Sequence, residues 1–64
     1  MKKSDLENYL ALGYRWACTY SPGPIGWGYG LCPPEYLKII DPSWIHKSSG
    51  ACLAWLRKNG YWKS

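Results

Sequence analysis

The chain has 64 residues, a formal net charge of +4, five Trp, six Tyr and no Phe. This length allows a single domain, residues 1–64, that buries only about 60% of its unfolded surface. No apolar stretch approaches the roughly 18 residues of a membrane span, so we expect no membrane association. The first residues lack the apolar run of a signal peptide, and the number of cysteines is odd. We therefore expect a cytoplasmic protein with reduced thiols.

The first predicted element is an amphipathic helix over residues 5–20. Ser4 and Glu7 have the spacing of a capping box at its start. Apolar residues then recur at helical spacing and would share one face: Leu6, Tyr9, Leu10, Gly13, Trp16, Ala17 and Tyr20. A helical glycine costs about 1 kcal/mol relative to alanine, so Gly13 on that face indicates a closely packed neighbour. Ser21 before Pro22 should end the helix.

The next segment, residues 21–36, is rich in glycine, proline and aromatic residues. Trp27 and Tyr29 alternate with glycines there, which fits either a short strand or an irregular loop. A single strand has no evident partner unless residues 61–63 supply one, so we expect a long loop. This loop would present Trp27 and Tyr29 to a protein partner, and the alternative is that Trp27 folds inward over the core.

The second half of the chain carries three helix-start signals. Pro33-Pro34-Glu35 favours a short helix, and Asp41-Pro42 favours a new cap and a further turn. Ser48-Ser49-Gly50 indicates a break before a last helix over residues 50–59, which Asn59-Gly60 should end. A continuous helix over residues 42–59 is the alternative. The expected fold is mainly α: a compact single domain of three or four short helices with one long Gly/Pro/aromatic loop.

Charge is unevenly distributed along the chain. Residues 1–41 contain four basic and four acidic residues, whereas residues 42–64 contain no acid. The predicted basic surface consists of Lys47, Arg57, Lys58 and Lys63. Such a surface favours an acidic partner, either nucleic acid or an acidic protein face, and the alternative is an ordinary solvated helix face. No known nucleic-acid-binding signature matches the sequence.

Candidate catalytic and metal-binding residues are few. Cys18, Cys32, His46 and Cys52 could in principle bind zinc, but zinc modules usually bring their ligands in close pairs. Cys52 and His46 could form a nucleophile and base, yet Cys52 falls on the apolar face of the last helix, where an inert core thiol is expected. We therefore expect no catalytic residue, no metal, no cofactor and no enzymatic activity.

Taken together, these patterns favour a small inhibitor or adaptor that sterically occupies a larger protein with an acidic or apolar groove. The predicted partner-binding residues are Trp27, Tyr29, Tyr61 and Trp62. The size and type of the chain are those of accessory proteins of phages and mobile elements, although no motif carries that assignment. The alternative is a small basic nucleic-acid-binding protein that uses its C-terminal helix, with Tyr61 or Trp62 stacking on bases.

Overall fold

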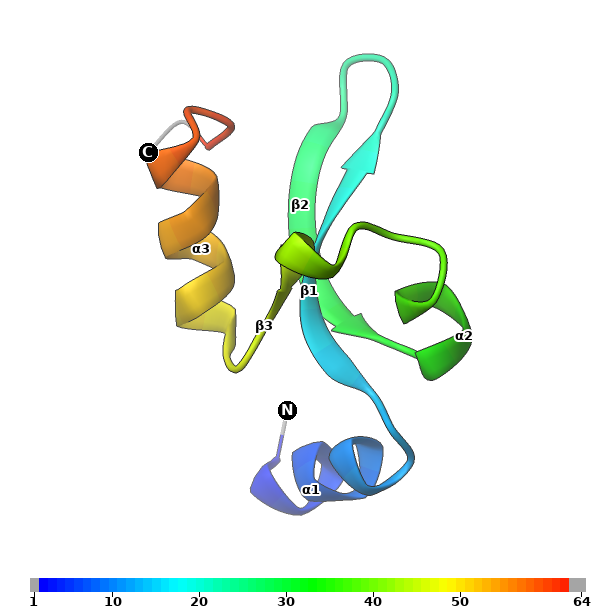
Figure 1. The fold of residues 1–64 in the computed structure, drawn as a ribbon. Coiled ribbons are helices and arrows are strands. Elements are labelled where there is room, and N and C mark those ends of the chain that lie inside the picture. The colour runs from blue at the N-terminus through cyan, green and yellow to red at the C-terminus, as the bar shows by residue number, and fades with distance from the viewer. Residues whose placement is uncertain (1, 63–64) are drawn as a thin grey trace.

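A computed structural model describes residues 2–62 and shows an α+β fold (Figure 1). A three-stranded antiparallel sheet in the order β2-β1-β3 lies between α3 on one side and α2 on the other. The elements in chain order are α1 (Lys3–Ala11), β1 (Arg15–Ser21), β2 (Gly26–Cys32), α2 (Pro34–Leu37), the 3₁₀ helix η1 (Pro42–Trp44), β3 (Ile45–His46) and α3 (Ser49–Lys58).

The prediction of a mainly α domain is wrong, because residues 15–32 form a β-hairpin. The second half of the expected helix over residues 5–20 is β1, and much of the expected loop over residues 21–36 is β2. Trp16, Cys18 and Tyr20 also alternate along the chain, so the same apolar residues fit a strand as well as a helix. Because residues 15–21 were assigned to a helix, they were not recognised as the partner strand that residues 26–32 needed.

Gly13 is the residue that separates α1 from β1. It takes a φ of +94°, which favours glycine, and the helix has already ended at Ala11. The Gly13 N–H donates to the Leu10 carbonyl at 3.1 Å and the Tyr14 N–H donates to the Tyr9 carbonyl at 3.0 Å, which is the hydrogen-bond pattern of a Schellman motif. The expected close neighbour exists, since a Cβ built on Gly13 would lie 3.3 Å from Pro34 Cγ.

The hairpin turn explains why β1 and β2 pair. Residues 22–25 connect the strands, with Ser21 opposite Gly26 and Arg15 opposite Cys32. Pro22 followed by Gly23 at φ +89° has the preferred residues of a type II turn. The turn therefore reverses the chain at the Pro/Gly cluster from which a loop was predicted.

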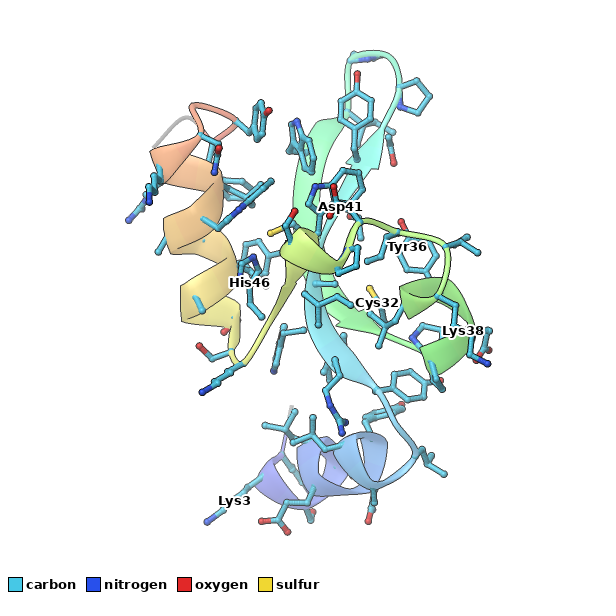
Figure 2. All side chains as sticks on the ribbon, in the orientation of Figure 1. Lys3, Cys32, Tyr36, Lys38, Asp41 and His46 are labelled. Atoms are coloured by element: carbon cyan, nitrogen blue, oxygen red, sulfur yellow. The ribbon has the colours of Figure 1, made fainter. Side chains whose placement is uncertain are left out.

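The register divides the hairpin into a large-residue face and a small-residue face. Direct pairing of Cys18 with Tyr29, together with strand alternation, places on one face Trp16, Cys18, Tyr20, Trp27, Tyr29 and Leu31. This face packs against α3, where Cys18, Cys52 and Leu56 form the fully buried core. The other face carries Ala17 and Cys32 together with three glycines of β2. Figure 2 shows His46 on the α3 side of the sheet and Cys32 on the α2 side.

Two helix caps confirm the helix starts predicted at Asp41 and at Ser48 in the second half of the chain. Asp41 caps η1, because its Oδ1 accepts a hydrogen bond from the Ser43 N–H at 2.9 Å. Ser48 caps α3, because its Oγ accepts from the Ala51 N–H at 3.1 Å. Since β3 lies between η1 and α3, the alternative of one continuous helix over residues 42–59 is wrong.

The first helix is attached to the sheet mainly through its last turn. No residue of α1 is buried, and the predicted capping box is wrong because Lys2 is the N-cap and supplies no side-chain bond. The Arg15 guanidinium donates to the Leu10 carbonyl at 3.0 Å, and the Tyr9 and Tyr14 rings lie 4.9 Å apart. None of the helices within residues 2–62 has both the length and the apolar character needed to cross a bilayer.

Candidate aromatic interaction surface

The main concentration of rings lies where the hairpin meets the end of α3. We call this the aromatic surface and define it by the five residues Tyr20, Trp27, Tyr29, Tyr61 and Trp62. These rings come from β1, β2 and the segment that follows α3, so distant parts of the chain build one surface. Trp44 of η1 and Trp55 of α3 support it from within the fold.

Trp27 is the centre of this surface. Its ring is stacked on Tyr61, with centroids 4.5 Å apart and an interplanar angle of 13°. Edge-on contacts to Trp44 at 5.0 Å and Trp55 at 5.6 Å hold it from the core side. Tyr20, its direct partner across the hairpin, lies 5.2 Å away. Ring pairs in these geometries each contribute about 0.5–1.5 kcal/mol beyond the area they bury, so Trp27 is firmly positioned.

The end of α3 explains how Tyr61 reaches Trp27. Gly60 takes a φ of +76° after the C-cap residue Asn59. The Gly60 N–H donates to the Arg57 carbonyl at 3.1 Å and the Tyr61 N–H donates to the Leu56 carbonyl at 2.9 Å, which is again a Schellman motif. The chain therefore turns back at Gly60, as the Asn-Gly signal predicts, and Tyr61 packs on the hairpin.

The tyrosines of the surface are exposed while the tryptophans beneath them are half-buried. The exposed fractions are 52% for Tyr20, 38% for Tyr29 and 46% for Tyr61. Tyr29 also packs against Trp62, with ring centroids 5.5 Å apart. Amphipathic rings that are fixed by rings below them and open above are typical of protein interfaces. The surface thus combines rigid placement with accessible apolar area.

The structure brings together all four residues predicted to bind a partner. Trp27 and Tyr29 lie on one face of β2, in contact with Tyr61 and Trp62 respectively. They are strand residues and are not displayed on a loop, so the predicted geometry of presentation is wrong. Sequence reasoning missed Tyr20, because the helical interpretation assigned it to the core face. The period-2 spacing of Trp16, Cys18 and Tyr20 was the signal that could have identified it.

The predicted basic residues lie around α3. Lys47 precedes the helix, whereas Arg57 and Lys58 lie in its last turn, and all three side chains are exposed. Lys63 lies outside the described residues. Arg57 and Lys58 stabilise the carbonyl end of the helix dipole and directly precede the turn to Tyr61. Two cations therefore lie next to the aromatic surface in the chain, while Lys47 lies at the other end of α3.

The three thiols are buried and make core contacts. The Cys18 thiol donates to the Cys52 carbonyl at 3.6 Å, and Cys32 lies on the opposite face of the sheet. Burial is the main cause that raises the pKa of Cys52 to about 12, and the neighbouring Cys18 adds to the effect. A thiol with this pKa is neutral at pH 7 and is a poor nucleophile. Within residues 2–62, no group of three or more His, Cys, Asp or Glu residues is placed to hold a metal ion.

His46 occupies the last position of β3, opposite Trp16. Its ring lies 5.9 Å from that of Trp55, on the side of the sheet that faces α3. In the part of the chain that the structure describes, its Nε2 is buried and has no hydrogen-bond partner. His46 therefore lies beside the Trp55 ring, and no hydrogen bond joins it to Cys52 within residues 2–62.

No protein-family model matches the chain, and comparison with curated proteins and with solved structures found no match.

Proposed function

We propose that the protein is a small inhibitor or adaptor that binds a larger protein through the aromatic surface. The observation that supports this proposal is the convergence of Trp27, Tyr29, Tyr61 and Trp62 on one surface with exposed tyrosines. Interface hot spots are enriched in Trp and Tyr, because these rings supply large contact area at a low cost in conformational entropy. The proposed mechanism is steric occupation of a groove on the partner.

The charges close to the surface in the chain suggest what the partner groove should look like. Arg57 and Lys58 lie in the last turn of α3, just before the turn that leads to Tyr61, and the aromatic residues themselves are uncharged. A matching groove would be apolar at its centre and acidic at its rim, so that rim charges speed association while the rings provide affinity. A phage or mobile-element origin fits the size of the chain and remains part of this proposal.

The test is capture from a nuclease-treated native lysate, with bound proteins identified by mass spectrometry. We expect the wild type to capture one protein in stoichiometric amount. The Tyr61→Ala variant should bind that protein at least about 30-fold more weakly than the wild type does, which corresponds to the roughly 2 kcal/mol of a hot spot. Tyr9→Ala is the matched control, because Tyr9 is 40% exposed, close to the 46% of Tyr61, but lies on α1. Equal losses for both variants would contradict the assignment of the surface.

The competing nucleic-acid function gives a different result in the same experiment. Capture that depends on nucleic acid disappears with nuclease and weakens steeply with salt, with a log-log slope of nearly one for each phosphate contact. In that case Arg57→Ala and Lys58→Ala should each reduce the slope by about one. Capture by the aromatic surface should instead tolerate moderate salt.

A further inference from the structure

The outer edge of β2 has unpaired backbone groups. β2 is hydrogen-bonded to β1 on one side, and the sheet order β2-β1-β3 places no strand on its other side within residues 2–62. In an antiparallel ladder, every second residue directs its N–H and C=O away from the neighbouring strand. In the described part of the chain, the backbone of residues 26–32 makes no backbone hydrogen bond beyond its pairing with β1. Only the Cys32 thiol donates to the Gly30 carbonyl, at 3.6 Å.

This edge lacks the features that normally prevent strands from pairing between molecules. Edge strands are commonly protected by charged side chains, by proline or by being very short. β2 is seven residues long and reads GWGYGLC, without a charge or a proline. β3, at the opposite edge, has only two residues. The edge of β2 is therefore the part of the sheet that is suited to accept another strand.

We propose that β2 pairs with β2 of a second copy of this chain, antiparallel across a two-fold axis at Tyr29, to form a six-stranded sheet. Tyr29 is the central residue of the strand, so a symmetric register would place it opposite its own copy. Trp27 of each chain would then lie opposite Leu31 of the other, and Gly28 opposite Gly30. Large residues meet large residues on one face, and on the other Gly28 meets Gly30 and Gly26 meets Cys32.

The uncharged composition of β2 favours a second copy over a strand that carries charges. A neutral strand brings no like charges together when it pairs with itself, and opposed aromatic and apolar pairs each add about 0.2–1 kcal/mol.

The glycines of β2 allow a sharp test of the register. A Cβ on Gly30 would meet nothing within 4 Å and one on Gly28 would meet only Thr19 Oγ1, at 3.8 Å. Neither glycine has a positive φ, so both positions accept a side chain in the monomer. We would compare three double variants: Gly28→Lys with Gly30→Lys, Gly28→Glu with Gly30→Glu, and the neutral control Gly28→Thr with Gly30→Thr. Circular dichroism would check the fold of each.

Analytical ultracentrifugation over a range of concentrations provides the main readout. Wild type and the threonine variant should reach twice the 7.3 kDa mass of one chain. The lysine and glutamate variants should each dimerise roughly tenfold more weakly or worse, because like charges lie directly opposite one another. An equimolar mixture of the two should dimerise again. A wild type that stays monomeric at millimolar concentration, or a mixture that does not recover, would overturn the proposal.

Amide hydrogen exchange of the wild type gives a second test that needs no variant. In a monomer every second amide of residues 26–32 faces solvent and should exchange rapidly. In the proposed dimer these amides are also bonded, so their protection should increase with protein concentration. The exposed apolar residues of α1 are the competing interface, and a dimer that is lost in Leu12→Ser but retained in the lysine variant would assign the contact to α1 instead.

Discussion

At the scale of single residues, the three cysteines behave as small apolar side chains. Cys18 and Cys52 are fully buried against Leu56, and Cys32 is 7% exposed on the opposite face of the sheet. Burial raises the pKa of all three thiols above the ordinary value. A raised thiol pKa means that the neutral form is favoured in the fold. The contribution of the neutral thiols to the free energy of unfolding is therefore complete below about pH 9. For Cys52 it is lost as the pH rises through about 12.

We predict that a thiol reagent such as DTNB at pH 8 will not label the native protein within minutes. Labelling requires an accessible thiolate, and the fold supplies neither access nor a lowered pKa. The same reagent in guanidinium chloride should label three thiols per chain, which serves as the control. Rapid labelling of one thiol in the native protein would show that this cysteine is not part of the core.

Residue-scale signals are also where sequence reasoning was most successful. The caps at Asp41 and Ser48 and the positive φ of Gly60 were predictable, because they depend only on a few adjacent residues. Gly13 shows the limit of such local rules. A closely packed neighbour was inferred, and the structure identifies it as Pro34, but the positive φ of Gly13 was not inferred, since nothing in residues 5–20 distinguishes a glycine within a helix from one that ends it.

At the scale of elements, the hairpin was the feature that the sequence concealed. Residues 15–21 satisfy both helical and strand periodicity, and only pairing with residues 26–32 selects the strand. The four predicted aromatic residues converge all the same, because the turn at Gly60 directs Tyr61 and Trp62 back onto β2. Their exact partners depend on the register of β2, which requires knowledge of β1.

The turn after α3 leads to a prediction about one glycine. Gly60→Ala should lower the free energy of unfolding by about 1–2 kcal/mol, because alanine at φ +76° is strained and Tyr61 loses its placement. Gly50→Ala is the control, since Gly50 is helical and a Cβ there would meet only Ser48 Oγ at 3.9 Å. It should be neutral or stabilise by up to about 1 kcal/mol. Urea denaturation followed by tryptophan fluorescence measures both.

At the scale of the whole molecule, the chain is less compact than its length allows. Its radius of gyration is 12.0 Å, whereas a compact domain of this length would have about 11 Å. Figure 1 shows α1 set apart from the sheet and α3. Tyr9, Leu10 and Leu12 of this region stay 37% exposed or more. The N-terminal helix therefore adds length to the molecule and little to its core.

We predict that the amides of α1 will exchange with deuterium faster than those of β1 and α3. α1 has no buried residue and is held by its last turn, so it can open without disturbing the core around Cys18 and Leu56. Hydrogen-exchange mass spectrometry with peptide resolution would measure the difference. Equal protection of α1 and α3 would mean that the whole chain opens as one unit.

The sheet order has a consequence for the entropy of chain closure. Pairing β1 directly with β3 would close the chain over residues 18–44, but the short turn between β1 and β2 allows the hairpin to form first. Because Cys32 then already lies beside Arg15, the chain left to close is residues 33–44, less than half as long. Each halving of a loop lowers its closure cost by about 0.6 kcal/mol. The central position of β1 thus replaces one long closure by two short ones.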